Sequence, residues 1–238
     1  MNEARQPIYL FSDSQLLFWR EETRLFLDSV RALISSKSPR AAYVGASNGD
    51  DPRFYSIFEA AMESITISER RMIHSAFSDA DRRFVVDADL VLLAGGDIER
   101  GWRVINDTGL GELLIRKYAE GAVLMGISAG AAQLGLFALR EGAESAAGLI
   151  EMLRLVPFIV GSHEEHEDWT NLRSTIEACD GKAIGIGIPS GGGMAYHPDG
   201  SVQALRRTLH EFTSVNGRIR ERLLIPPAEG ADLSGRSH

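Results

Sequence analysis

The sequence predicts an α/β fold, a doubly wound and mostly parallel sheet with helices on both faces and antiparallel additions near the C-terminus. Strand-like apolar runs alternate five times with segments of helical periodicity before residue 130. One run, at 90–94, is continuously apolar, as is typical of a strand buried on both faces of a parallel sheet. Ligands of such folds bind beyond the carboxyl ends of the strands, which is where we expect a functional site.

The first half of the chain supplies the alternating elements. Strands are predicted at 8–11, 41–44, 70–74, 87–94 and 122–125. Apolar residues at helical spacing predict helices within 15–33, from 52 to 61, between 98 and 114, and from 129 onward. Both glycine-bearing turns, after Leu93 and after Met125, are therefore expected at one edge of the sheet.

Beyond residue 140 the pattern becomes less regular. A small-residue, acidic loop at 141–148 leads to two apolar pieces around Pro157 and then to a polar stretch at 161–169. A helix is predicted over 171–179, a glycine-interrupted strand over 183–188, and hairpin turns at 197–200 and 216–217. We therefore predict a single domain over 1–225, antiparallel at its end, and a polar C-terminal tail over 226–238.

Composition restricts the class of function. The 238 residues carry a net charge of −8, which argues against a broad nucleic-acid surface. Cys179 is the single cysteine, so no intramolecular disulfide can form, and no Cys/His cluster has zinc-site spacing. Residues 1–7 carry no apolar signal core, and no apolar run approaches the ~18–20 residues that span a membrane. We expect a cytoplasmic protein without nucleic-acid or membrane partners, and a homodimer is compatible with the sequence.

The most informative motif is Gly126-Ile127-Ser128-Ala129-Gly130, which fits G-x-S-x-G between an apolar strand and an alanine-rich helix. A serine on such a turn, a nucleophile elbow, is strained, exposed at the end of the sheet and close to backbone N–H groups. These features make its hydroxyl useful as a nucleophile. Tight packing of small residues gives the same pattern, so the hypothesis depends on partners for Ser128 elsewhere.

His163 is the predicted general base. It follows the apolar run 158–160 and Gly161-Ser162, which places it at the mouth of a strand. His166 is the alternative, and a solvated polar loop is the structural explanation for either histidine.

The orienting acid has several candidates near the serine and the histidine. Glu141 and Glu144 fall between these two residues, and the choice between them stays open. Glu164 and Glu165 are too close in sequence to His163 to point naturally back at the imidazole.

A glycine pair is predicted to complete the site. Gly95-Gly96 ends a buried strand, where backbone N–H groups can face a cavity. An oxyanion hole needs two donors ~3 Å from the developing charge, and the N–H of Ala129 is the natural second one. Asp97 is also a suitable N-cap, so a tightly packed helix start is the structural explanation for the same residues.

Three stretches together resemble one family. Leu93–Asp97, Gly126–Ala131 and Leu155–His163 are similar, in order and spacing, to motifs of the peptidase E and cyanophycinase family of serine peptidases. The resemblance covers roughly residues 7–205. It implies a fold like that of class I glutamine amidotransferases, with serine in place of the usual cysteine, and it implies no metal or organic cofactor.

The resemblance implies a role for each matching residue. Ser128 would be the nucleophile, His163 the base, and Glu141, in preference to Glu144, the acid. Gly96 and Ala129 would donate to the oxyanion, and Asp97 and Arg173 would bind the substrate. Three positions depart from the family pattern, namely Ile98 after G-G-D, Ser162 before the histidine, and Ser190 where some members place an acid.

We predict a serine peptidase that cleaves a small peptide or amide, as dipeptidases and cyanophycinases do. The departures suggest, as the alternative, a non-catalytic small-molecule-binding module on the same fold. An α/β-hydrolase-type esterase has the same order of serine, acid and histidine. However, the chain has no HGGG-type segment, and His163 follows Ser128 by only 35 residues.

Overall fold

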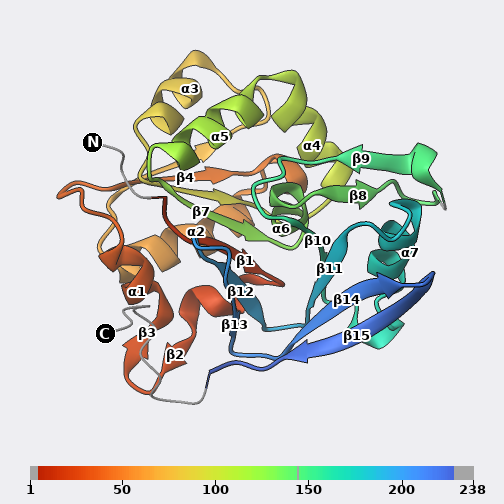
Figure 1. The fold of residues 1–238 in the computed structure, drawn as a ribbon. Coiled ribbons are helices and arrows are strands. Elements are labelled where there is room, and N and C mark those ends of the chain that lie inside the picture. The colour runs from red at the N-terminus through yellow and green to blue at the C-terminus, as the bar shows by residue number, and fades with distance from the viewer. Residues whose placement is uncertain (1–4, 144, 228–238) are drawn as a thin grey trace.

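The computed structural model describes residues 5–143 and 145–227. Its central sheet contains the strands β1 (Ile8–Phe11), β4 (Arg40–Val44), β5 (Glu69–Ile73), β6 (Leu90–Leu93), β7 (Val123–Ile127), β12 (Gly193–Tyr196) and β13 (Val202–Leu205). Their order is β13-β12-β1-β7-β6-β4-β5 (Figure 1). Five neighbouring strands run parallel to one another, namely β1, β7, β6, β4 and β5. Strands β12 and β13 are antiparallel additions at one edge. The predicted fold class is confirmed.

Helices cover both faces of this sheet. One face carries α1 (Phe26–Ala32) and α2 (Pro52–Ser64). The other carries α3 (Asp79–Val86), α4 (Ile98–Asp107), α5 (Leu110–Ala119) and α6 (Ala129–Leu134). The central strand β6 shows why its sequence is continuously apolar: Leu90 and Leu92 pack into one core and Val91 and Leu93 into the other.

A second sheet, which the sequence does not predict, lies beside the first (Figure 1). It contains β10 (Phe158–Ser162), β11 (Ile184–Ile188), β14 (Leu209–Val215) and β15 (Arg218–Leu224), in that order. Strands β10 and β11 are parallel and the others antiparallel. Helix α7 (Thr170–Ala178) packs on this sheet through Leu172 and Ile176. Gly187 of β11 leaves room for the ring of Trp169, which an added Cβ would approach to 2.7 Å.

Several local predictions are confirmed. Helix α2 begins at Pro52, and α7 occupies the segment predicted around 171–179. The predicted hairpin turns connect β12 to β13 and β14 to β15. Two short hairpin-like pairs complete the structure, β2 (Arg20–Glu21) with β3 (Arg24–Leu25), and β8 (Phe137–Leu139) with β9 (Leu149–Glu151).

Two helix predictions are wrong in their extent. The segment 15–33 contains a 3-10 turn, the β2–β3 pair and the short α1 instead of one helix. The segment 98–114 contains two helices, because the backbone turns at Gly109 with φ 74°. Helix α3 was not predicted. Residue 144 and residues 228–238 of the predicted tail lie outside the described residues. Within 5–143 and 145–227, no helix is both long and apolar enough to cross a membrane.

Candidate active site

Ser128 lies directly after β7, at the carboxyl edge of the central sheet. Its backbone has φ 48° and ψ −109°, a conformation that residues with a side chain rarely adopt. The Ser128 N–H donates to the carbonyl of Phe11 at 2.8 Å, which ties the turn to β1. The Ser128 side chain makes no capping hydrogen bond to α6. Its hydroxyl is therefore available to another group.

The glycines of the G-x-S-x-G motif allow this turn to pack. A Cβ on Gly126 would lie 2.5 Å from the carbonyl oxygen of Gly130, and one on Gly130 would lie 2.2 Å from that of Leu93. Both distances are far inside van der Waals contact with backbone atoms. Helix α6 can therefore lie against β6 and β7 only because both positions lack a side chain.

His163 lies directly after β10, at the end of the second sheet. Its φ is 50°, and its N–H donates to the carbonyl of Ile188 on the neighbouring strand at 2.9 Å. The imidazole Nε2 is 2.8 Å from the hydroxyl oxygen of Ser128. The structure thus brings together the predicted serine and the predicted histidine, each at the end of a strand in a different sheet. His166 lies in a short 3-10 turn at Glu165–Glu167 and is exposed.

The glycine pair after β6 lies beside the serine. A Cβ on Gly95 would be 3.4 Å from the Cβ of Ser128, so the two turns are in contact. Gly96 has φ 135° and is solvent-exposed, whereas Ala129 is 2% exposed at the start of α6. The predicted oxyanion donors therefore belong to adjacent turns at the same edge of the sheet.

Of the two predicted acids, the structure describes Glu141. Glu141 is exposed, and its N–H donates to the Glu99 carboxylate at 3.2 Å. No hydrogen bond or ion pair joins Glu141 to His163 within 5–143 and 145–227. Glu144 lies outside the described residues.

Two other acidic residues, Glu164 and Glu165, follow His163 in the chain. Burial raises the pKa of Glu164, although its hydrogen bond from the Leu172 N–H at 3.2 Å and the charge of His163 act in the opposite direction. Burial also opposes ionisation of Glu165, but hydrogen bonding to Ser190, whose N–H lies 3.0 Å away, outweighs it and lowers the Glu165 pKa. Within the described residues neither carboxylate is hydrogen-bonded to His163, as their closeness to it in sequence predicts.

The two predicted substrate-binding residues have partners inside the protein. Asp97 accepts a hydrogen bond from the N–H of Arg100 at 2.9 Å and so caps α4. The guanidinium of Arg173 donates to the carbonyl of Asp168 at 2.8 Å and lies 4.7 Å from the ring centre of Phe212. Substrate binding by either residue stays a prediction. Among the described residues, no group of three His, Cys, Asp or Glu side chains could hold a metal ion.

Comparison with known proteins gives this geometry a context. The sequence matches peptidase family S51 over residues 8–204, which includes both strand ends that carry Ser128 and His163. The chain belongs to peptidase family S51. The family assignment agrees with the resemblance deduced from the three motifs.

Three known proteins are similar to this chain. The uncharacterised peptidase YgaJ of Bacillus subtilis (strain 168) is 26% identical over 134 residues, which are 56% of each chain. The crystal structure of a peptidase from an acI-B1 Actinobacterium has a TM-score of 0.72 at 15% identity and covers 95% of this chain and 96% of that one. A protein from Listeria monocytogenes EGD-e, provisionally named a peptidase E, has a TM-score of 0.61 at 16% identity and covers 86% and 100%. At these identities the two structures show a shared fold.

Proposed function

We propose that this S51 chain is a serine peptidase that cleaves a small peptide or amide with Ser128 as its nucleophile. The observation that carries the proposal is the 2.8 Å distance between the Ser128 hydroxyl and the His163 Nε2. A weakly nucleophilic hydroxyl becomes reactive when a neutral imidazole within hydrogen-bond reach can accept its proton. The strained turn presents that hydroxyl to solvent and to the imidazole rather than to its own helix.

The geometry suggests the course of the reaction. Ser128 attacks the carbonyl carbon while His163 takes the hydroxyl proton, and His163 then gives this proton to the departing amine. The N–H groups of Gly96 and Ala129 stabilise the oxyanion of the tetrahedral intermediate. Water hydrolyses the acyl-enzyme in a second round that uses the same base. The reaction thus begins and ends with a neutral imidazole and a free serine.

A negative charge near His163 favours the imidazolium that forms during this reaction. Glu164, the next residue in the chain, interacts favourably with a charged His163 imidazole, but burial acts more strongly and favours the neutral Glu164 carboxyl. Glu141, and Glu144 as its alternative, stay predictions for a carboxylate that contacts the imidazole directly. Such a contact would fix the ring tautomer, which a charge at a distance does not.

Hydrolysis of a dipeptide panel tests the proposed function. We expect the wild-type protein to release amino acids from at least one dipeptide class and the Ser128→Ala variant to lose that activity by about 10⁴-fold or more. Ser201→Ala is the matched control, because Ser201 lies in the β12–β13 turn and bonds only within it. Full activity of Ser128→Ala would exclude Ser128 as the nucleophile. Hydrolysis of p-nitrophenyl acetate far above that of any peptide would instead favour the esterase alternative.

A further inference from the structure

Gln133 is a buried polar residue on the helix that follows the proposed nucleophile. It is 1% exposed and lies near the end of α6, among alanine and leucine side chains. Its Nε2 donates to the hydroxyl oxygen of Ser47 at 3.0 Å and to the carbonyl of Ile98 at 3.1 Å. One amide group therefore connects α6 to the loop after β4 and to the start of α4. An amide that is buried away from water needs such partners, so both hydrogen bonds stabilise the structure.

The two acceptors of Gln133 lie on either side of Gly96. Ile98 follows Gly96 in the chain, and the backbone of Ser47 contacts it from the other loop. The N–H of Asp97 donates to the carbonyl of Ser47 at 2.8 Å. A Cβ on Gly96 would lie 2.3 Å from that same carbonyl oxygen. One side of the Gly96 peptide therefore packs against the loop whose Ser47 side chain contacts Gln133.

Helix α4 approaches the same amide closely. A Cβ on Gly101 would lie 2.1 Å from the hydroxyl oxygen of Ser47 and 2.4 Å from Nε2 of Gln133. Only a glycine at this position leaves room for the hydrogen bond between Ser47 and Gln133. Gly101 of α4 thus leaves space for the side-chain amide of Gln133.

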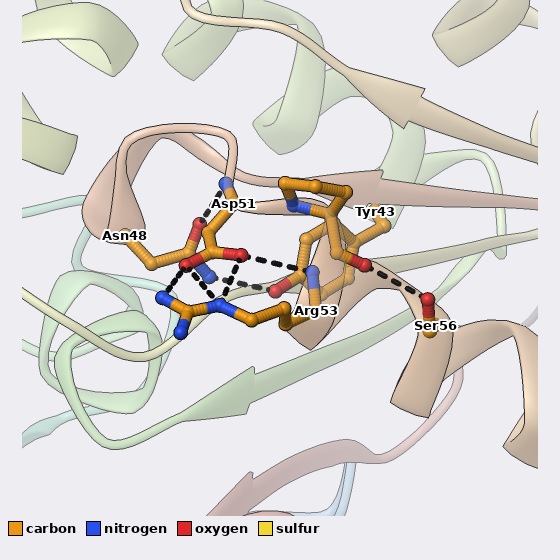
Figure 2. Close-up of polar contacts among 6 residues, drawn as sticks. Tyr43, Asn48, Asp51, Arg53 and Ser56 are labelled. Carbon is orange, nitrogen blue, oxygen red and sulfur yellow. Dashed lines mark hydrogen bonds and ion pairs between the residues drawn. The ribbon is translucent and has the colours of Figure 1, made fainter.

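The loop that carries Ser47 is itself fixed to the sheet. Figure 2 shows Asn48 donating from Nδ2 to the hydroxyl of Tyr43 at 2.8 Å, and the N–H of Asp51 donating to the Asn48 side chain at 3.2 Å. Tyr43 lies on β4, and burial raises its pKa to about 12, so it stays neutral at physiological pH. Asp51 accepts from Arg53 at the start of α2 in the same view. The loop that carries Ser47 is thus tied by hydrogen bonds to β4 and to the start of α2.

We propose that Gln133 is a positioning residue for the oxyanion hole. Its side-chain amide holds the N–H of Gly96 in register with that of Ala129. Ala129 begins α6, the helix on which Gln133 also lies. This short helix therefore carries one oxyanion donor, the Ala129 N–H. Through the Gln133 amide it also holds the segment that carries the other donor, the Gly96 N–H. This inference rests on the proposed function. Donors act on an oxyanion only when they are fixed at hydrogen-bond distance from the place where charge develops.

Inactivation by a fluorophosphonate probe tests this role, because its phosphoryl oxygen takes the place of the oxyanion. The probe gives two constants, KI for reversible binding and kinact for bond formation at the serine. Gln133→Met keeps the length of the side chain and removes its N–H donor. We expect kinact to fall about tenfold to a hundredfold, which is less than the loss of an entire oxyanion donor, while KI changes less than about threefold.

Two further variants distinguish positioning from a loss of stability. Val85→Ala truncates a fully buried side chain in α3, outside both loops, and should keep the wild-type kinact despite its lower stability. Ser47→Ala removes only the hydroxyl that accepts from Gln133. If Gln133→Met does not fold, the same fall in kinact with little change in KI is expected of Ser47→Ala.

The outcomes separate this inference from the proposed function. A wild-type protein whose Ser128 does not react with the probe would refute the proposed function itself. The role of Gln133 alone would be overturned if the wild-type protein reacts and the folded Gln133→Met variant has a kinact within about threefold of the wild-type value. An equal fall of kinact in Val85→Ala would also overturn it, because general destabilisation would then explain the effect.

Discussion

Ser128 and His163 both have a positive φ, of 48° and 50°. Such a conformation costs a residue with a side chain about 1–3 kcal/mol, so the surrounding structure must hold it. For Ser128 the hydrogen bond to Phe11 does so, and for His163 the hydrogen bond to Ile188. The two side chains meet because both backbones are held in unfavourable conformations at strand ends. Local strain of this kind is typical of functional sites.

Glu164 makes the stability of the folded protein depend on pH. Burial raises its folded-state pKa above the ordinary value of a glutamate, so the folded protein favours the protonated carboxyl. The stability that this group contributes is fully present below its unfolded pKa and is lost as the pH rises through the folded pKa. Glutamine resembles the protonated form at every pH. We therefore expect Glu164→Gln to match the wild-type protein near pH 4 and to be the more stable of the two near pH 7.

Urea denaturation of both proteins across this pH range measures the difference in unfolding free energy. Glu177→Gln is the matched control, since the Glu177 side chain is exposed on α7 and keeps its water. A difference that stays constant with pH, or one that favours the wild-type protein more as the pH rises, would contradict the buried carboxyl described for Glu164.

Single residues could be predicted from sequence only where a motif fixes the backbone around them. Ser128 follows from G-x-S-x-G, and His163 from its place after an apolar run. The role of Gln133 has no such signal, because its two acceptors, in the loop after β4 and at the start of α4, lie 86 and 35 residues away in the chain. Arg173 was predicted to bind substrate, but nothing in the sequence indicates its contacts with Asp168 and Phe212.

The serine turn is the element whose sequence determines its structure most strictly. Gly130 shows this at a single position, because its Cβ would lie 2.2 Å from the backbone oxygen of Leu93 on β6. A strand in the centre of a sheet cannot move away without loss of its ladder hydrogen bonds. We expect Gly130→Ala to lower the unfolding free energy by about 1–3 kcal/mol or more, as overpacking does in other cores.

Gly111→Ala is the control for this prediction, measured in the same urea titrations. Gly111 lies in α5, where an added Cβ would contact the end of the Leu153 side chain at 3.2 Å. A flexible side chain can yield, and alanine favours a helix over glycine by about 1 kcal/mol, so we expect little or no loss of stability. Equal stability of Gly130→Ala and the wild-type protein would mean that α6 does not pack on β6 as described.

Other elements were mispredicted for identifiable reasons. The apolar positions of 15–33 fit a helical period, but the charged run 20–24 between them forms the β2–β3 pair, whose turn includes Glu22 at φ 53°. A period that continues across a charged gap is therefore weak support for one helix. Gly109, by contrast, is a recognisable C-terminal signal, and its position after Thr108 could have divided α4 from α5.

At the scale of the whole molecule, the site depends on the placement of two sheets. The serine belongs to the central sheet and the histidine to the second one, and their side chains bridge the two. Val160 of β10 and Ile186 and Ile188 of β11 pack into the same core as β6 and β7, which fixes the sheets relative to each other. The sequence could not reveal this arrangement, because a buried parallel strand reads the same whichever sheet it joins.

The central claim is that Ser128 reacts as a nucleophile because His163, from the other sheet, accepts its proton. Mass spectrometry of the fluorophosphonate-treated protein, with peptide mapping of the adduct, tests this claim most directly. We expect one adduct, on Ser128, and a fall in its rate of formation of about 10²–10⁴-fold in a folded His163→Gln variant. An adduct on another residue, or labelling of Ser128 at the wild-type rate without His163, would contradict the claim.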